Sequence, residues 1–411
     1  MTVSEPVIDL RPHVRAGDGV WWSQAGAEAT PLVDALLDQV ADIGPVRAFT
    51  GLTLNRRLRE VPAEVALVSY GAMGELRRAR GLQVVPAHYS VLPRLFAERV
   101  LPGDVGLVQV SPPGPDGLCS LGIGVDYAGD AVAHSRVLVG EINHRMPATV
   151  GTPGIPLDRF AATVETDRPI PEVPDRAPDA VDEAIAARVA ALVDDGDTVQ
   201  MGVGALPSAI MDGLAGHRHL GFHSGMLTDG VVRLVEKGVL TGRHKEIDEG
   251  LLVTGAALGT TALYESLGAL PVVFRPASYT HDPGVLARLR RLVAINSAVE
   301  VDLSGQVNGE SVGGRYLGGI GGQADFSGAA ARTGARSIIA LRSTTARGDS
   351  TIVPTLDGPV STARADVDVV VTEHGTAWLR GCPLAERGQR LLAVADPRHR
   401  DALSRALQED S

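Results

Sequence analysis

The sequence has little cysteine and no long apolar run. Its two cysteines, Cys119 and Cys382, lie far apart in a chain of 411 residues. That is too few for a disulfide framework, which favours a reducing compartment and two small packed thiols. Residues 1–15 lack the apolar segment of a secretory signal, and no apolar run approaches the length that spans a membrane. We therefore expect a cytoplasmic protein with no membrane partner.

Positive charge is also in short supply. The chain has 38 Lys and Arg against 49 Asp and Glu, a net charge of −11. This balance argues against a nucleic acid as partner. It does not exclude a small anionic ligand, because helix N-termini and single arginines bind phosphate locally. The histidines are scattered, and the pair His217 and His219 has no further partner at metal spacing, so we expect no metal site.

Glycine and small apolar residues are abundant, with 48 Gly and only 4% aromatics. Short Val/Ile/Leu runs without polar alternation predict strands that are covered on both faces. These runs are residues 46–50, 64–70, 105–110, 136–143, 198–203, 250–256, 291–296, 337–341 and 368–373. Helical spacing occurs between them, for example over 182–196 and 228–240. The alternation predicts an α/β protein that binds its ligand at the carboxyl ends of the strands.

A proline-rich segment divides the chain into two halves. Residues 168–180, RPIPEVPDRAPDA, contain four prolines and five charges, so they cannot continue a helix or a central strand. The segments that begin at residues 17 and 196 both read Gly-Asp-x-Val, followed by a short strand, a Gly/Ala-rich turn, proline and a helix. We predict two related open α/β domains, residues 1–167 and 181–411, with a cleft between them.

Two glycine-rich stretches follow predicted strands in the second half. In MGVGALPSAIMDGL (201–214), Gly202 and Gly204 could form an oxyanion or phosphate cradle at a helix N-terminus, or only a tight turn. In GGRYLGGIGGQADF (313–326), six glycines fall within residues 313–322. That density favours a ligand-facing loop, because successive backbone amides suit phosphate, carbonyl or thioester oxygens.

Three polar stretches could carry chemistry. His223, Ser224 and Asp229 are close in sequence, so a turn and a helix cap explain them more simply than a triad does. Glu300 and Asp302 share one face of a predicted strand, where they could serve acid–base work or order the neighbouring loops. In PVVFRPASYTHDP (271–283), a strand over 272–274 runs into a polar loop that could line an active site.

Together these stretches resemble the acetyl-CoA hydrolase/transferase family of CoA-transferases, which includes 4-hydroxybutyrate and succinyl-CoA:acetate enzymes. The segments that carry the resemblance, in the family's order, are SPPGPDGLCSLGIGVDY (111–127), INHRMPAT (142–149), GVGALPSAI (202–210), HSGMLTDGVVRLVEKGVLTG (223–242), INSAVEVDLSGQVNGES (295–311), GGIGGQADF (318–326) and STIVP (350–354). The resemblance covers nearly the whole chain. It implies two tandem open α/β domains of the NagB/RpiA/CoA-transferase type, a CoA thioester and a carboxylate as substrates, and a homodimer.

The resemblance also implies roles for individual residues. Gly202 and Gly204 would lie near the thioester oxygen, and Ile320, Gly321 and Gly322 would line the path of CoA. In such enzymes a glutamate attacks the thioester, and an acyl-glutamyl anhydride and then a glutamyl-CoA thioester form.

The sequence departs from the family at that glutamate. Arg275-Pro276 and the run 279–283 anchor the family's glutamate segment without a gap, and they place Val273 at the glutamate position. An isopropyl group cannot form an anhydride. In addition, Thr351 replaces a basic residue of the family pattern, and Arg342 replaces a proline.

Three functions therefore stay open. The first is CoA transfer or thioester hydrolysis without the anhydride route, unless Glu265 or Glu300 substitutes for the missing carboxylate. The second is a repurposed homologue that carries out direct hydrolysis, ring closure or acyl transfer on a specialised substrate. Its candidate catalytic residues are His281, Asp282, Tyr279 and His223. The third is a CoA-binding subunit without catalysis.

Overall fold

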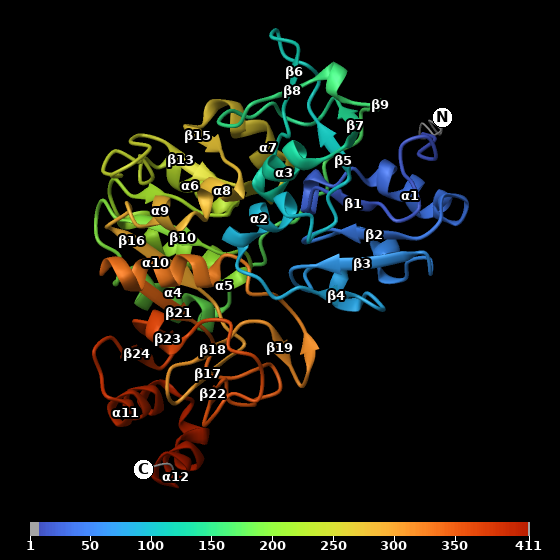
Figure 1. Ribbon diagram of the computed structural model, residues 1–411. Coiled ribbons are helices and arrows are strands. Elements are labelled where there is room, and N and C mark those ends of the chain that lie inside the picture. The colour runs from blue at the N-terminus through green and yellow to red at the C-terminus, as the bar shows by residue number, and fades with distance from the viewer. Residues whose placement is uncertain (1–7, 410–411) are drawn as a thin grey trace. The chain divides into compact units, whose positions relative to one another are not determined.

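The computed structural model describes residues 8–409, which pack as two compact units (Figure 1). Unit 1 comprises Met1–Val173 and Val253–Thr280, and unit 2 comprises Pro174–Leu252 and His281–Ser411. Residues 253–280 thus pack with the N-terminal part of the chain although they follow the proline-rich segment. That segment forms no regular structure up to Asp179. The boundaries of the two related domains stay a prediction.

Unit 1 is built on a seven-stranded parallel sheet with the order β4-β3-β2-β1-β5-β7-β9. The strands are β1 (Gly19–Trp22), β2 (Val46–Phe49), β3 (Val65–Ser69), β4 (Gln83–Val84), β5 (Val105–Val110), β7 (Val137–Asn143) and β9 (Ala162–Thr166). The order of strands reverses at β1, which lies between β2 and β5. Such a reversal opens a crevice at the carboxyl ends of the strands.

The two faces of this sheet are covered differently because successive side chains of a strand point to opposite faces. Val20 and Trp22 of β1 pack into an aliphatic core with α1 (Thr30–Ile43). Trp21 belongs to an aromatic cluster in which the ring centroids of Phe49 and Phe96 are 5.2 Å apart. The helices α2 (Leu92–Ala97) and α3 (Asp126–Ala131) contribute Phe96 and Tyr127 to this cluster. Much of the scarce aromatic content is thus concentrated on one face.

Residues 253–280 form the smaller elements of unit 1. They are β13 (Leu252–Thr254), β14 (Ala256–Ala257), α7 (Thr261–Ser266), β15 (Val272–Phe274) and α8 (Ala277–Thr280). Elsewhere in unit 1, β6 (Leu118–Cys119) pairs with β8 (Ile155–Pro156). Backbone bonds from Phe274 N to Val150 O (2.7 Å) and from Val125 N to Gly255 O (3.1 Å) tie this segment to the first 173 residues. The predicted strand over 272–274 exists, but it pairs with β13 outside the large sheet.

Unit 2 is built on a six-stranded sheet with the order β11-β10-β16-β21-β23-β24. Its strands are β10 (Thr198–Met201), β11 (Gly221–Phe222), β16 (Leu292–Asn296), β21 (Arg336–Ala340), β23 (Val369–Thr372) and the antiparallel edge strand β24 (Gly375–Trp378). Here the order reverses at β10, the first strand of the second half. β1 and β10 therefore occupy equivalent places, as expected for two related α/β domains.

The helices and small sheets of unit 2 surround this sheet. The helices are α4 (Ala180–Ala190), α5 (Ala205–Gly213), α6 (Asp229–Glu236), α9 (Pro283–Leu286), α10 (Gln323–Thr333), α11 (Leu384–Val394) and α12 (Arg400–Glu409). The remaining strands are β12 (Met226–Leu227), β17 (Glu300–Asp302), β18 (Val307–Asn308), β19 (Ser311–Val312), β20 (Arg315–Tyr316) and β22 (Ile352–Val353). One core packs α11 against Ile339 and Val370, and another packs α10 against Leu292 and Ala294.

The structure confirms the predicted α/β class with parallel sheets, and both cysteines are free. Among residues 8–409, no helix combines the length and the apolar character needed to cross a membrane. Within the same range, no three His, Cys, Asp or Glu side chains gather closely enough to hold a metal ion.

Candidate active site

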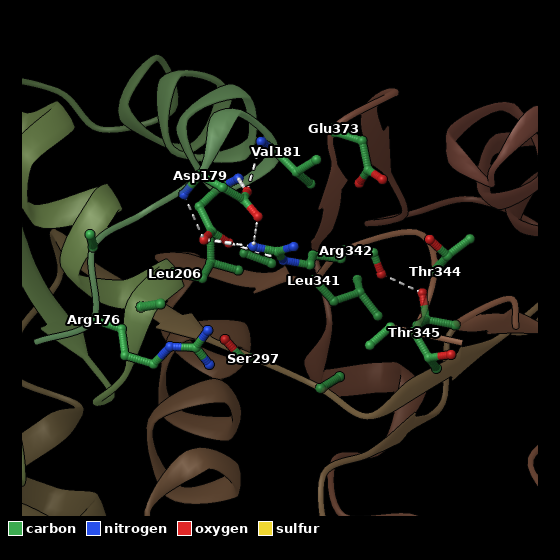
Figure 2. Close-up of a pocket in the computed structure, with 17 residues that line it drawn as sticks. Arg176, Asp179, Val181, Leu206, Ser297, Leu341, Arg342, Thr344, Thr345 and Glu373 are labelled. Carbon is green, nitrogen blue, oxygen red and sulfur yellow. Dashed lines mark hydrogen bonds and ion pairs between the residues drawn. The ribbon is translucent and has the colours of Figure 1, made fainter. Parts of the chain in front are cut away.

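A cavity of about 640 Å³ lies at the carboxyl edge of the sheet of unit 2 (Figure 2). Its walls come from the start of α5 and from the loops that follow β16, β21 and β23, and they include Leu206, Ser297, Arg342, Thr345 and Glu373. This is the edge at which open parallel sheets bind their ligands. The proline-rich segment adds Arg176 to the wall.

The turn between β10 and α5 supplies backbone donors at this edge. Gly204 has φ of +121°, a conformation that residues with a Cβ rarely adopt. No side chain caps α5 at Gly204, so the first amides of the helix are not consumed by a capping residue. Gly202, Val203 and Gly204 are all exposed. The turn can therefore present N–H groups and the positive end of α5 to an oxygen of a ligand.

Arg342 places a fixed positive charge in the wall of the cavity. Its Nη2 lies 2.7 Å from the carboxylate of Asp182 and 2.9 Å from that of Asp179. Figure 2 shows the guanidinium directed at Asp179. The hydrogen bond to Asp182 raises the pKa of Arg342 above its usual value. Arg176 makes no ion pair with another described residue, so its charge is available to an anionic ligand.

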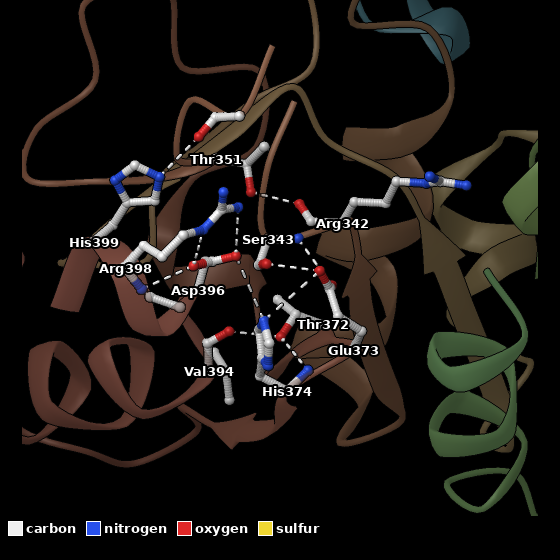
Figure 3. Close-up of polar contacts among 12 residues, drawn as sticks. Arg342, Ser343, Thr351, Thr372, Glu373, His374, Val394, Asp396, Arg398 and His399 are labelled. Atoms are coloured by element: carbon white, nitrogen blue, oxygen red, sulfur yellow. Dashed lines mark hydrogen bonds and ion pairs between the residues drawn. The ribbon is translucent and has the colours of Figure 1, made fainter. Parts of the chain in front are cut away.

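Side chains behind the cavity hold its polar groups in place (Figure 3). The carboxylate of Glu373 accepts hydrogen bonds from the backbone N–H (2.9 Å) and the hydroxyl (2.7 Å) of Ser343. Thr351 donates from its hydroxyl to the backbone carbonyl of Arg342 at 2.5 Å. Thr351, the position where the sequence departs from the family's basic residue, thus lines the cavity and fixes the Arg342 loop.

His281 and His223 meet around Phe326. The ring of Phe326 lies 5.0 Å from that of His281 and 6.5 Å from that of His223. Both histidines are buried. Burial lowers the pKa of His281 to about 3, and the neighbouring His223 acts in the same direction. His281 is therefore neutral at physiological pH.

Two glycines make room for the imidazole of His281. A Cβ at Gly322 would lie 2.4 Å from its Nε2, and a Cβ at Gly225 would lie 2.9 Å from its Cε1. The predicted CoA-path residues Ile320, Gly321 and Gly322 stand directly before α10, and Gly322 lies beside His281. Gly225 was not singled out from the sequence, because a glycine between two predicted turn residues carries no sign of what it faces.

The other predicted catalytic residues have different surroundings. Asp282 accepts a hydrogen bond from Val285 N at 2.8 Å and caps α9. Tyr279 lies in unit 1, half-buried, with the guanidinium of Arg275 5.2 Å from its ring centroid. Arg275 also donates to the carbonyl of Gly151 at 2.6 Å. Tyr279 thus belongs to unit 1, whereas His223, His281 and Asp282 belong to unit 2.

Val273 is buried in β15 of unit 1, with 8% of its surface exposed. Gly151 packs against it, since a Cβ on this glycine would lie 3.0 Å from that of Val273. Glu265 lines another cavity of unit 1, of about 450 Å³. Glu300 lies on β17 in unit 2, with Asn308 Nδ2 3.5 Å from its carboxylate. Glu300 belongs to the same unit as the cavity of about 640 Å³ but is not among the described residues that line it.

Comparisons with known proteins extend over both units. A family model described as the acetyl-CoA hydrolase/transferase C-terminal domain matches residues 259–407. The 4-hydroxybutyrate coenzyme A transferase of Clostridium kluyveri is 39% identical over 323 residues, which are 77% of this chain and 75% of that protein. The crystal structure of RipA from Yersinia pestis aligns with a TM-score of 0.91 and 32% identity, covering 99% of this chain and 97% of RipA. That of a 4-hydroxybutyrate CoA-transferase from Porphyromonas gingivalis gives a TM-score of 0.83 and 33% identity over 97% of this chain and 95% of that one.

Proposed function

Because this chain belongs to the acetyl-CoA hydrolase/transferase family, we propose that it acts on acyl-CoA thioesters in the cavity of unit 2. The reaction is CoA transfer to a carboxylate or hydrolysis of the thioester. The observation that carries this proposal is the exposed Gly202–Gly204 turn, which starts α5 at the edge of a cavity of about 640 Å³. Backbone donors of this kind stabilise the oxyanion that develops on a thioester carbonyl, and one donor can contribute roughly 10²–10³ in kcat.

The charges of the cavity suit the remainder of a CoA thioester. Arg176 offers an unpaired guanidinium to a phosphate, whereas the charge of Arg342 is balanced by Asp179 and Asp182. The glycines before α10 supply further amides for CoA. These contacts orient the thioester and leave the choice of nucleophile open.

We propose that no enzyme-bound glutamyl thioester forms, because Val273 stands at the family's glutamate position. In hydrolysis, water attacks the thioester carbonyl directly and the C–S bond breaks, which releases the acid and CoA. In transfer, the acceptor carboxylate attacks instead and forms a mixed anhydride with release of CoA thiolate, and the thiolate then attacks the acceptor's carbonyl and releases the donor acid. His281 is a poor general base, since its pKa of about 3 lies far below neutral pH. As a neutral imidazole it can instead orient a reactant by a hydrogen bond.

The direct test is incubation of the protein with acetyl-CoA or succinyl-CoA in the presence of acetate. We expect release of free CoA thiol or formation of a new acyl-CoA, without a protein species that gains the mass of CoA. Peptide mass spectrometry can trap and locate a protein-bound CoA thioester. Rapid exchange through such a thioester would contradict the claim that the anhydride route is lost.

Two variants then locate the nucleophile position. Val273→Glu restores the carboxylate at the position assigned from the sequence and should produce a trappable CoA adduct. Gly225→Glu is the comparison, because position 225 faces His281 beside the glycine loop in unit 2. An adduct in Gly225→Glu but not in Val273→Glu would move the vacant glutamate position from residue 273 to residue 225.

A repurposed homologue is the second candidate, and the buried pair of histidines around Phe326 favours it. In this case a nucleophile carried by the substrate, or water, would attack, with His281, Asp282, Tyr279 and His223 as polar groups. Asp282→Asn also weakens the cap of α9, so the melting temperature of this variant is measured beside its activity and that of His281→Ala. If His281→Ala and Asp282→Asn both retain the full activity of the wild type, His281 and Asp282 do not have the proposed roles.

A CoA-binding subunit without catalysis is the third candidate. Equilibrium dialysis with CoA and acetyl-CoA separates it from the other two. Binding of CoA without turnover supports the binding subunit. The absence of CoA binding counts against both the binding subunit and the acyl-CoA enzyme. The homodimer and the cytoplasmic location stay predictions.

A further inference from the structure

A second, smaller cavity lies in unit 1 at the place equivalent to the β10–α5 turn of unit 2. It has a volume of about 260 Å³ and is formed by the turn after β1, the loop after β2 and the start of the proline-rich segment. Like Gly204, the turn residue Ala25 has a positive φ, of 54°. The cavity therefore occupies the reversal of strand order in unit 1, where a ligand is expected.

Glu28 is the unusual group in this cavity. The residue lines the cavity and is 3% exposed. Oε2 accepts a hydrogen bond from the hydroxyl of Thr53 at 2.5 Å, whereas Oε1 has no hydrogen-bond partner among residues 8–409. Burial raises the pKa of Glu28 to about 7, against the lowering effect of Thr53. Near neutral pH the carboxyl group can therefore be either neutral or charged.

Arg168 supplies a hydrogen-bond donor to the wall of this cavity. Its Nε and Nη2 donate to the buried carboxylate of Glu141 at 2.6 and 2.9 Å, and Nη2 also donates to the backbone carbonyl of Glu28 at 2.7 Å. These bonds fix the guanidinium. Nη1 makes no hydrogen bond with another described residue and is left for a ligand.

We propose that this cavity binds the carboxylate of a small acid, held by Arg168 Nη1 while the buried carboxyl group of Glu28 is protonated and neutral. An ionised Glu28 would repel the bound anion across the poorly hydrated wall, where charges interact strongly. Leu54 and Pro31 give the wall an apolar part for a short alkyl chain. The volume equals that of about nine water molecules at ~30 Å³ each, which suits a small acid rather than CoA. That this acid is the acceptor of the CoA transfer rests on the proposed function, whereas its binding does not.

Two charged groups, Asp34 and Arg168, act on Glu28. Asp34 of α1 also lines the cavity and raises the pKa of Glu28, and Arg168 lowers it. Asp34 is itself engaged, since it accepts from Asn55 Nδ2 at 3.2 Å and lies 3.5 Å from the guanidinium of Arg57. It therefore offers little to a cationic ligand, and Glu28 remains the group whose charge sets the preference of the cavity.

Calorimetric titration of the full chain with sodium butyrate, in chloride buffers at pH 6 and pH 8, tests this proposal. Butyrate is ionised at both values. With a Glu28 pKa of about 7, the protonated fraction falls from about ten elevenths to about one eleventh, so the affinity should fall about tenfold. Glu28→Gln should bind butyrate with less than about twofold difference between the two pH values, because the amide is neutral at both.

Glu165→Gln is the matched control, because Glu165 lies on β9 of the same unit with 72% of its side chain exposed. It should retain the pH dependence of the wild type. The proposal is overturned if the wild type binds no butyrate, if Glu28→Gln keeps the tenfold dependence, or if butylammonium binds in place of butyrate. Circular dichroism at both pH values confirms that each variant is folded. Butyrate binding in a protein without acyl-CoA turnover would support this site and count against the proposed function.

Discussion

The buried carboxyl group of Glu28 links the stability of unit 1 to pH. Its pKa rises from 4.5 to about 7 on folding, so between these values the folded chain holds a proton that the unfolded chain releases. The free energy of unfolding therefore falls as the pH rises through this window. A rise of this size corresponds to roughly 3 kcal/mol between pH 4.5 and pH 8. Glu28→Gln should flatten this fall, as measured by urea unfolding at pH 5 and pH 8.

The exposed Glu165 provides the comparison for this measurement. Glu165→Gln should show the same loss of stability as the wild type between the two pH values, because its side chain is 72% exposed. An equal loss in wild type and Glu28→Gln would mean that Glu28 is ionised in the folded chain throughout, and it would contradict the raised pKa.

Single residues show where the sequence was informative. The residue types alone marked the glycine-rich stretches and the histidines as candidates for the site. The structure places His281 beside Gly322 and near His223. Their protonation could not be predicted, because burial of His281 depends on Phe326, which is distant in sequence. Glu28 was overlooked for the same reason, since a glutamate before a helix usually stays exposed.

At the scale of elements, two glycines allow the loops after β11 and before α10 to enclose His281. Ala at position 322 would place a Cβ 2.4 Å from the imidazole, and Ala at position 225 would place one 2.9 Å away. The imidazole is buried and cannot yield freely, so overpacking should cost about 1–3 kcal/mol. We expect Gly322→Ala to lower the melting temperature more than Gly225→Ala does. Gly216→Ala is the control, because no atom lies within 4 Å of its added Cβ. Equal losses in all three variants would contradict the packing described.

A buried ion pair fastens α4 to the loop after β21. Arg342 contacts Asp182, whose side chain is 3% exposed. Arg342→Met leaves this buried carboxylate with only the backbone N–H of Asp179 as a partner, at 3.3 Å, and breaking a fully buried pair costs about 3–5 kcal/mol. Since 42% of the Arg342 side chain is exposed, we expect a smaller loss of about 1–3 kcal/mol in urea unfolding.

The exposed ion pair of Arg233 and Asp212 is the control for the loss of stability expected in Arg342→Met. Its side chains are 40% and 52% exposed, so Arg233→Met should cost at most about 1 kcal/mol. If Arg342→Met and Arg233→Met destabilise the protein equally, Asp182 is not desolvated as described. A measurement in high salt adds a second check, because screening weakens the exposed pair more than the buried one.

The strands were largely predictable from apolar runs, but their partners were not. The runs at 46–50, 105–110 and 291–296 became central strands of the large sheets. The runs at 250–256 and 272–274 look the same in sequence, yet they form the separate pair β13–β15. Backbone pairing depends on contacts between distant segments, and a local pattern carries no information about them.

At the scale of the whole molecule, the chain returns to unit 1 after it has begun unit 2. A linear division at residues 168–180 follows from composition, because prolines and charges mark an extended connector. No comparable feature of composition predicts that residues 253–280 pack with unit 1. This packing is visible only in tertiary bonds, such as that from the Thr152 hydroxyl to the carbonyl of Phe274 at 2.8 Å.

This return predicts the behaviour of a nicked chain. Arg176 is exposed in the proline-rich segment, so mild trypsin treatment should cleave after it and give fragments of 176 and 235 residues, since 411 − 176 = 235. Because residues 253–280 of the second fragment pack with residues 1–173 of the first, the fragments should co-elute in native gel filtration and separate only in urea. Arg176→Gln should resist this first cut. Two folded fragments that separate without denaturant would contradict the assignment of residues 253–280 to unit 1 and would favour a simple division at the linker.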